Sequence, residues 1–241
     1  MTIQGNGQSA ENQLFWVADN TIATDFPPVS HALRDPDGLL AIGGDLAADR
    51  LLHAYELGIF PWYSEGQPIL WWSPDPRCVL EPGKVKVSRS LSKRIRKNEF
   101  RITYNKVFNE VILACARPRD QLSGTWITQD MMNAYGALHR LGHGISVEAW
   151  QENELVGGLY GVVIGKVFFG ESMFSYKTDA SKVALVHLSE TLADMDFRLI
   201  DCQVHSAHLQ SMGALPMQRE LFVSILNNFC KNEAPLNWPE D

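Results

Sequence analysis

Three polar side chains interrupt stretches that otherwise have the apolar character of buried strands. Glu171 lies within "VFFGESMFS", and Asp201 and Gln203 lie within "LIDCQV". Burying a carboxylate without a partner costs several kcal/mol, roughly, so these acids require either basic partners or a water-filled cleft. A cleft would make them candidates for catalysis, whereas salt bridges or positions at strand edges would make them structural. The spacing alone favours neither interpretation.

The alternation of side chains along a strand predicts how these groups are arranged. Asp201 and Gln203 are two residues apart and are expected on one face of their strand. The same rule places Glu171 on one face of the earlier strand with Phe169 and Met173. An acid beside an amide can form an orienting relay, in which the carboxylate polarises the amide and the amide oxygen accepts a hydrogen bond.

Other chemically capable residues have weaker support. Cys202 follows Asp201, but alternation directs its thiol to the opposite face, which favours a packed core thiol over a nucleophile. His205 and His208 have the i, i+3 spacing of metal ligands, yet no third ligand has a suitable spacing, so a solvent-facing pair is favoured. Four tryptophans could stack on nucleobases or belong to the core, and both interpretations stay open: Trp62, Trp71, Trp72 and Trp126.

The composition is that of an ordinary globular protein. The 241 residues are 45% hydrophobic and 20% charged, and the apolar runs are far shorter than the roughly 20 residues that cross a bilayer. The amino-terminal residues have neither the basic start nor the apolar core of a secretory signal, so we expect a cytoplasmic protein without a membrane span. Four scattered cysteines are expected as free thiols: Cys78, Cys115, Cys202 and Cys230.

A local basic segment contrasts with the net charge of -7. Residues 84–97, "KVKVSRSLSKRIRK", contain seven of the 21 Lys and Arg residues and no acid. The spacing predicts a helix from Ser88 to Lys97 with four cations on one face. Such a face binds phosphates or is merely solvated. The four cations are Arg89, Lys93, Arg96 and Lys97, and we count Arg94 with them as a phosphate-binding candidate.

Turn signals divide the chain into two predicted domains. The first third is rich in Pro and Gly and predicts a small, loop-rich domain with one short helix, which Asp45 would cap and Gly58 would end. We place the boundary in "WWSPDPR", which gives a small domain over residues 1–76 and a second domain over residues 77–241. About the first 13 residues are expected to be a mobile leader.

The second domain has the pattern of a sheet flanked by helices. Helices are predicted around residues 108–116 and 129–141, followed by three antiparallel strands: "GISVEAW", "ELVGGLYGVVIG" and "KVFFGESMFS". A long helix, "DASKVALVHLSETLADMDF", then leads by a crossover to the strand "FRLIDCQV" and to two last helices. The predicted fold class is α+β, with an acetyltransferase-like (GNAT-like) domain whose mixed, mainly antiparallel sheet is flanked by helices.

Eight motifs occur in an order that closely resembles the leucyl/phenylalanyl-tRNA-protein transferases: "GLLAIGGDL", "GIFPW", "ILWWSPDPR", "GTWIT", "ELVGGLYGV", "GESMFS", "ASKVAL" and "LIDCQV". The resemblance implies a small N-terminal domain and an enzyme that moves Leu, Phe and, less well, Met from aminoacyl-tRNA to the α-amine of proteins beginning with Arg or Lys. Such tagging would mark those proteins for degradation by the N-degron pathway. The resemblance further implies a chemistry without metal or coenzyme, and we expect a monomer.

The resemblance also implies roles for single residues. Asp201 and Gln203 resemble the family's catalytic pair, and Glu171 its third polar site residue, which would bind the cationic end of the acceptor. The basic helix would bind phosphates of the acceptor stem. An apolar pocket for the aminoacyl side chain is implied for Leu159, Phe168, Met173, Leu185 and Ile200, and an aromatic wall near the terminal adenosine for Trp62 and Trp126.

Two details of the sequence qualify these implied roles. Leu159 stands where the family's "GGMYG" pattern has Met, which would reshape the pocket. Strict alternation places Ile200 on the face opposite Asp201, so the apolar pocket and the catalytic pair can meet only if that strand twists or ends.

Two other functions fit parts of the sequence. An acetyl-CoA-dependent acetyltransferase has the same expected fold but needs a Gly-rich loop at the start of the long helix to hold pyrophosphate. That segment reads "SYKTDASKVAL" and contains no glycine. A non-catalytic RNA-binding module would account for the basic helix but not for Glu171, Asp201 and Gln203.

Overall fold

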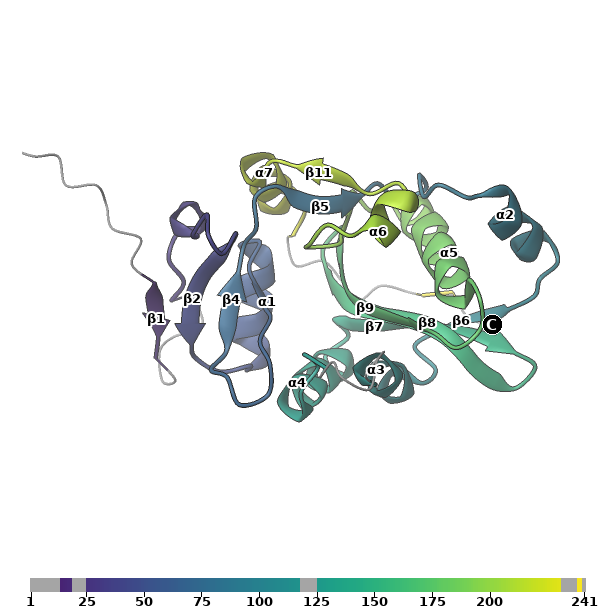
Figure 1. Ribbon diagram of the computed structural model, residues 1–241, viewed down its shortest axis with the longest axis horizontal. Helices are drawn as coiled ribbons and strands as arrows, with labels where there is room; N and C mark the ends of the chain where they lie inside the picture. Colours follow the sequence, from purple (N-terminus) through teal and green to yellow (C-terminus); the bar gives the residue numbers. More distant parts are fainter. Residues whose placement is uncertain (1–13, 19–24, 118–124, 231–237, 240–241) are drawn as a thin grey trace, which may run out of the picture.

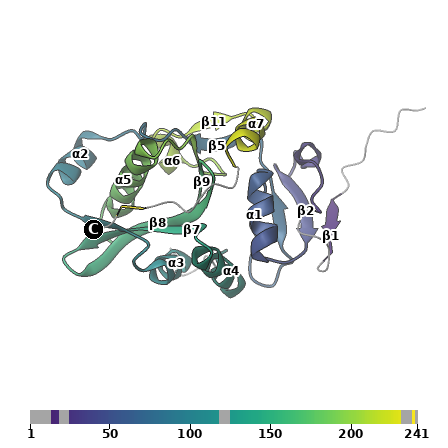
Figure 2. The same cartoon turned by 180° about the vertical axis from the view of Figure 1, so that it is seen from behind.

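The computed structural model describes residues 14–18, 25–117, 125–230 and 238–239, and it contains two separate sheets (Figure 1). The predicted mobile leader lies outside the described residues. The small sheet has the strand order β1-β2-β4-β3, with helix α1 beside it (Figures 1 and 2). Its elements are β1 (Phe15–Val17), a short 3₁₀ helix (Val29–His31), β2 (Leu39–Gly43), α1 (Ala48–Glu56), β3 (Phe60–Pro61) and β4 (Leu70–Trp72).

The large sheet has seven strands in the order β11-β5-β10-β9-β8-β7-β6. Every neighbouring pair is antiparallel except β10 with β9, so the sheet is mixed and mainly antiparallel, as predicted. The strands are β5 (Arg77–Leu80), β6 (Arg101–Tyr104), β7 (Gly144–Gln151), β8 (Glu154–Ile164), β9 (Val167–Ser175), β10 (Leu199–Asp201) and β11 (Leu215–Met217).

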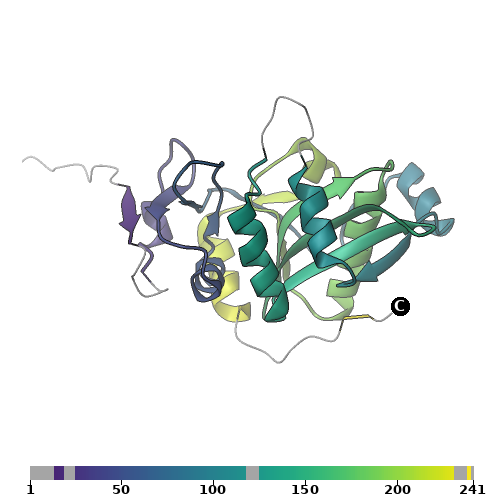
Figure 3. The ribbon, with the colours of Figure 1, turned by 90° about the horizontal axis from the view of Figure 1, so that it is seen from below.

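Helices cover both faces of the large sheet (Figures 1 and 3). Helices α3 and α4 pack together on one face, and α5 lies on the other with α2 beside it. Helix α7 lies near β5 and β11, on the side of the small domain (Figures 1 and 2). The helices are α2 (Arg89–Arg96), α3 (Phe108–Ala116), α4 (Gln129–Arg140), α5 (Ala180–Asp194), α6 (Ala207–Ser211) and α7 (Arg219–Phe229).

The predicted meander of three antiparallel strands is confirmed as β7, β8 and β9. The chain then crosses the sheet through α5 and returns in β10, which pairs in parallel with β9 and confirms the crossover. The register sets Ile200 beside Phe168 and Asp201 beside Phe169. The strand that carries Asp201 therefore neighbours the strand that carries Glu171.

Two apolar clusters fill the space on the two faces of the large sheet. One includes Leu188 of α5 and Ile200 of β10. The other includes Phe108 and Tyr135 from the α3 and α4 face and continues through Trp71 into the small domain. The two sheets therefore share a continuous core, because burial of apolar surface does not stop at the domain boundary.

Helix α1 begins without its predicted cap. The Asp45 carboxylate accepts a hydrogen bond from the Ala47 N–H and pairs with Arg50, while Ala47 itself precedes the helix. Gly58 follows the helix with a φ of +79°, a left-handed conformation that glycine adopts readily, so its role as the end of the helix is confirmed.

Seven strands escaped prediction: the four strands of the small sheet, where only a loop-rich domain was expected, and β5, β6 and β11 of the large sheet, which carry no clear alternation. All four residues of β5 are buried, and β6 and β11 are only 4 and 3 residues long.

All four cysteines are free, as predicted. In the described ranges, every helix is too short or too polar to span a membrane.

Candidate active site

A cavity of about 340 Å³ lies where β8, β9 and β10 meet α5 and α6. The family resemblance implied that five residues form a pocket for the aminoacyl side chain. All five line this cavity: Leu159, Phe168, Met173, Leu185 and Ile200. Glu171, Gln203 and Trp126 belong to the same lining. One cavity thus joins an apolar wall to a carboxylate and an amide.

A β-bulge in β9 brings Glu171 to this cavity. Tyr160 pairs with Ser172, whereas the next residue of β8, Gly161, pairs with Gly170, so Glu171 is the extra residue. A bulge re-aims side chains because it shifts the alternation by one position.

The bulge also overturns the predicted arrangement of the neighbouring side chains. Phe169 was expected to share a face with Glu171 and Met173. Phe169 and Glu171 do lie on one side, since both contact Tyr55, but Met173 does not share it. Phe168 and Met173 pack in the cluster on the α5 face, whereas Phe169 packs in the opposite cluster. Phe168 and Met173, which both line the cavity, are therefore an odd number of positions apart along the strand.

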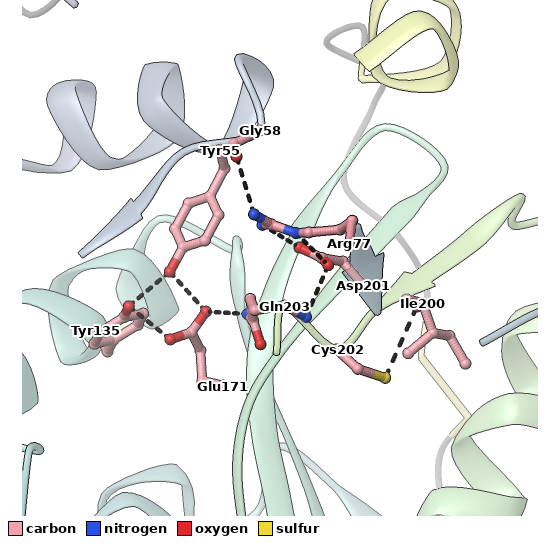
Figure 4. A network of polar contacts seen from close by, with 9 residues as sticks. All are labelled: Tyr55, Gly58, Arg77, Tyr135, Glu171, Ile200, Asp201, Cys202 and Gln203. Atoms are coloured by element: carbon pink, nitrogen blue, oxygen red, sulfur yellow. Dashed lines mark hydrogen bonds and ion pairs between the residues drawn. The ribbon is translucent and has the colours of Figure 1, made fainter. Parts of the chain in front are cut away.

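Three protein groups donate hydrogen bonds to the Glu171 carboxylate (Figure 4). Tyr55 Oη lies 2.7 Å from Oε1, Tyr135 Oη lies 2.8 Å from Oε2, and Gln203 Nε2 lies 3.2 Å from Oε1. Burial raises the pKa of Glu171 to about 7, although the two tyrosine hydrogen bonds lower it. A carboxylate is tolerated in this strand because protein donors satisfy it before any substrate binds.

Asp201 lies behind the cavity wall and is fully buried. Its two oxygens accept hydrogen bonds of 2.8 and 2.7 Å from Arg77, and Oδ1 also accepts one of 2.9 Å from the backbone N–H of Gln203. In this structure no hydrogen bond joins the Asp201 carboxylate to the side-chain amide of Gln203, so the predicted relay stays a prediction. That amide donates to Glu171 instead (Figure 4).

The end of β10 allows the apolar pocket and the polar groups to meet. The strand ends at Asp201. Gln203 has a backbone φ of +54°, in the left-handed region that residues other than glycine rarely adopt. Alternation stops there, so Ile200 and Gln203 both line the cavity. The hydrogen bond from the Gln203 N–H to Asp201 holds this unusual backbone in place.

Arg77 is a buried cation that the sequence reasoning did not identify. Its guanidinium lies 4.7 Å from the ring centres of both Phe60 and Phe222 and donates a hydrogen bond of 3.1 Å to the Gly58 carbonyl oxygen. It thereby joins the small domain, α7 and β10. The available signal was the acid in an apolar strand, because a buried Asp201 requires a cationic partner.

Sequence reasoning also missed the hydroxyls of Tyr55 and Tyr135. Tyr55 is one of the buried residues of α1. Both side chains are fully buried, and their hydroxyl oxygens lie 2.6 Å apart beside Glu171. A sequence stripe does not reveal such a contact, because Tyr55 and Glu171 are 116 positions apart.

Comparison with known proteins identifies the family. Residues 44–75 match the family described as "Leucyl/phenylalanyl-tRNA protein transferase N-terminal domain", and residues 79–227 match "Leucyl/phenylalanyl-tRNA protein transferase". A protein of Nitrosomonas europaea named leucyl/phenylalanyl-tRNA--protein transferase is 56% identical over 204 residues, which cover 85% of this chain and 86% of that protein. One of the same name from Stutzerimonas stutzeri is 52% identical over 225 residues, 93% of this chain and 99% of that protein.

The chain belongs to the leucyl/phenylalanyl-tRNA protein transferase family. It is therefore a transferase enzyme.

The similarity of this chain to solved structures is weaker. A GCN5-related N-acetyltransferase from Kribbella flavida covers 69% of this chain, and the chain covers 59% of it, with a TM-score of 0.36 and 10% identity. The structure of L-PGS from Bacillus licheniformis covers 78% of this chain, and this chain covers 59% of L-PGS, with a TM-score of 0.39 and 10% identity.

In this transferase, Cys202 does not have the properties of a nucleophile. A hydrogen bond with the neighbouring Cys78 thiol, together with burial, raises the pKa of Cys202 well above its ordinary value. His208 lines the cavity, whereas His205 is exposed outside it. Among the described residues, no group of three His, Cys, Asp or Glu side chains could hold a metal ion.

The tryptophans of the transferase divide into core and accessible residues. Trp71 is fully buried and donates a hydrogen bond to the Gly43 carbonyl oxygen. Trp126 lines the cavity. Trp62 is 42% exposed and lies against Trp72, with ring centres 5.8 Å apart, but it does not line the cavity. The structure therefore does not bring the two proposed adenosine-binding tryptophans, Trp62 and Trp126, into one cavity.

Helix α2 of the transferase has the predicted bounds, and the Ser88 side chain caps it by accepting a hydrogen bond from the Leu91 N–H. Arg94 differs from the other cations because it pairs with Glu99 and Asp179. Its guanidinium is engaged by these two acids within the protein, and its binding to phosphate stays a prediction. Within the described part of the chain, the remaining four cations are exposed and form no ion pair: Arg89, Lys93, Arg96 and Lys97.

Proposed function

We propose that the enzyme transfers Leu, Phe and, less well, Met from aminoacyl-tRNA to the N-terminal α-amine of proteins that begin with Arg or Lys. The products would be marked for degradation by the N-degron pathway. The observation that carries the proposal is the cavity in which Leu159, Phe168 and Met173 face the same space as Gln203 and Glu171. We further propose that the protein acts as a monomer in the cytoplasm, the compartment in which free thiols are usual.

The apolar wall of the cavity supports an unbranched or γ-branched donor side chain. Phe168 and Met173 offer one flat and one flexible surface, which suit planar Phe and branched Leu. Val and Ile branch at Cβ, next to the ester, where the bound group has least room. Apolar pockets separate such neighbours by only about 1 to 3 kcal/mol, so partial use of Met is expected, and charged side chains are excluded more strongly.

The reaction itself requires no powerful nucleophile. The aminoacyl ester is already activated, and an α-amine has a pKa of roughly 7.7 to 8.0, so a substantial fraction is neutral near physiological pH. Attack of the amine nitrogen on the ester carbonyl forms the peptide bond and releases the 3′ oxygen of the tRNA, which takes a proton. Holding amine and ester in contact can supply about 7 to 11 kcal/mol of the barrier reduction, and no metal or coenzyme is needed.

Gln203 is the group that we assign to the attacking amine. Its NH₂ group donates to Glu171, which directs the amide oxygen away from that carboxylate. The amide oxygen can then accept a hydrogen bond from the amine and orient its lone pair toward the ester. The rigid backbone at Gln203, held by Asp201, keeps the amide in that position.

We propose that the tRNA binds to helix α2 and to two accessible tryptophans. The exposed cations of α2 are proposed to contact phosphates of the acceptor stem, which positions the RNA without reading its bases. Trp126 lines the cavity and is proposed to stack on the terminal adenosine, with exposed Trp62 as a second platform outside it.

The test combines a panel of donors with a panel of acceptors. Purified protein is incubated with labelled Leu-, Phe-, Met-, Val- or Ile-tRNA and with peptides that differ only in their first residue, which is Arg, Lys or Asp. We expect label on the Arg and Lys peptides from Leu and Phe, weak label from Met, and almost none from Val or Ile. Binding of tRNA without transfer of label to any peptide would support an RNA-binding module instead.

A further inference from the structure

Tyr55, Tyr135 and Glu171 form a closed triangle of oxygen contacts beside the cavity (Figure 4). The two hydroxyl oxygens are 2.6 Å apart, and they lie 2.7 and 2.8 Å from the Glu171 oxygens Oε1 and Oε2. All three distances are those of O–H···O hydrogen bonds. The triangle joins two domains, because Tyr55 comes from α1 of the small domain and Tyr135 from α4.

The number of hydrogens in the triangle depends on Glu171. Each contact needs one hydrogen, and an ionised carboxylate has none to give. The two tyrosine hydroxyls then supply two hydrogens for three contacts, which leaves one pair of oxygens facing each other without a hydrogen. A protonated Glu171 supplies the third hydrogen, and every contact becomes a hydrogen bond. The geometry is therefore complete only when the triangle holds one additional proton.

We propose that this triangle takes up the proton that the acceptor's α-ammonium must lose before it attacks the ester, an inference that rests on the proposed function. The N–H bond of the ammonium breaks and an O–H bond forms on Glu171, so the products are a neutral amine and a neutral carboxylic acid. Glu171 reaches the substrate because it lines the cavity beside Gln203. The proton later leaves to solvent, which restores the carboxylate.

The charged and titratable groups around Glu171 support this role. Burial raises the pKa of Tyr55 and Tyr135 well above the usual range, so both keep their hydrogens. The carboxylate itself titrates near neutral pH, close to the amine that it would serve. The groups that face Glu171 from the packed elements are Tyr55 of α1, Tyr135 of α4, Tyr160 of β8, Asp201 of β10 and Arg77 of β5.

The roles of the three side chains differ. Glu171 would be the catalytic residue, since it exchanges the proton with the substrate. Tyr55 and Tyr135 would be positioning residues, since they act only through Glu171. A positioning residue for proton uptake should matter when the amine arrives protonated and should not matter when the amine is already neutral.

The experiment compares the Tyr55→Phe and Tyr135→Phe enzymes with the wild type at several pH values. Each change removes one hydroxyl and keeps the ring. With labelled Leu-tRNA and an Arg peptide, we expect about tenfold slower transfer near pH 7, the effect of one hydrogen bond, and recovery to within about twofold near pH 9. With hydroxylamine, an acceptor that is unprotonated at neutral pH, we expect no difference at either pH.

The control is Tyr104→Phe, which also loses one hydroxyl contact, of 2.8 Å to Thr191, but lies outside the cavity. It should transfer normally at both pH values. Melting temperatures of all variants identify any loss of fold. If the Tyr55 and Tyr135 variants lose rate equally at both pH values, or with both acceptors, the triangle is structural and the proposal fails.

Two further observations separate this failure from failure of the proposed function. A wild type that transfers no label overturns the proposed function. In that case the near-ultraviolet absorbance of the tyrosines still tests the triangle. It should change with one titration near pH 7 that is absent from Glu171→Gln, and a spectrum that stays flat from pH 5 to 9 would overturn the triangle itself.

Discussion

At the scale of single residues, Arg77 and Asp201 form a buried ion pair beside the candidate site. Both side chains are almost completely buried, and two short hydrogen bonds join them. Removing one partner of such a pair leaves an uncompensated charge. The pair also holds the backbone from which Gln203 projects, because the Gln203 N–H donates to Asp201.

Asp201→Asn should therefore destabilise the protein strongly. The change keeps the size of the side chain but leaves the Arg77 guanidinium without its counter-charge. We expect the free energy of unfolding to fall by about 3 to 5 kcal/mol, measured by urea unfolding. The exposed Asp194→Asn serves as the control and should change it by less than about 0.5 kcal/mol. A loss below about 1 kcal/mol for Asp201→Asn would contradict a structural ion pair.

Neutralising Glu171 should have the opposite effect on stability to neutralising Asp201, because the ionised form of Glu171 is unfavourable in the fold. Its pKa is raised from 4.5 to about 7. The stability contributed by the protonated form is complete below pH 4.5 and is lost as the pH rises through 7. Glu171→Gln keeps the neutral state at every pH, so it should be more stable than the wild type at pH 8 and nearly equal to it at pH 5.

Urea unfolding at the two pH values measures this difference. The same variant should lose transfer activity, which would be a trade of stability for function at one side chain. A stability difference that does not depend on pH would show that Glu171 titrates outside this range and would contradict the account of its burial.

At the scale of elements, β9 and β10 explain why a regular pattern gives an irregular site. The lengths of the three meander strands and of α5 could be predicted because their apolar patterns are long. The bulge at Glu171 and the end of β10 at Asp201 could not, because both depend on pairing with neighbouring strands. The site lies where these two irregularities meet.

A change on β9 tests whether the cavity selects the donor. Met173→Ala enlarges the apolar end, and we expect transfer from Leu-tRNA to fall about tenfold relative to transfer from Phe-tRNA. Affinity for tRNA should stay unchanged. The matched control is Met132→Ala, a partly buried methionine outside the cavity. An unchanged ratio of Leu to Phe transfer with a lowered melting temperature would assign Met173 to the core only.

Helix α2 makes a separate prediction about tRNA binding. Replacing Arg89, Lys93 and Arg96 by Ala should weaken all aminoacyl-tRNAs about equally, since phosphate contacts carry no sequence information. Each lost contact should reduce the slope of log affinity against log salt by roughly 0.7 to 0.9. Arg140→Ala, an exposed cation at the end of α4, provides the control. Unchanged affinity and slope in the triple variant would mean that α2 is only a solvated face.

At the scale of the whole molecule, the limits of sequence reasoning follow from distance along the chain. The apolar lining residues and Gln203 were identifiable from motifs, and the structure brings them into one cavity. The contacts that support them were not identifiable. Asp201 and Arg77 are 124 positions apart, and Glu171 and Tyr55 are 116 apart. The first pairing is created by the neighbouring strands β5 and β10 of the large sheet, and the second by packing of α1 against that sheet. Neither pairing leaves a local pattern in the sequence.

The same contacts join the small domain to the candidate site. Tyr55 reaches Glu171, and the Gly58 carbonyl oxygen and the Phe60 ring hold Arg77. Both ends of the polar network therefore depend on the segment from α1 to β3. The two sheets are separate, but residues from the parts of the chain that form both sheets build the candidate site.

The most direct test of the central claim is the single-turnover transfer rate of Gln203→Ala with saturating labelled Leu-tRNA and an Arg peptide. The account predicts a loss of about 100-fold, because the amide oxygen no longer orients the amine, with unchanged tRNA affinity and melting temperature. The exposed Gln210→Ala, in α6 beside the cavity, should retain the wild-type rate. A Gln203→Ala enzyme that transfers Leu within about threefold of the wild-type rate would contradict the account.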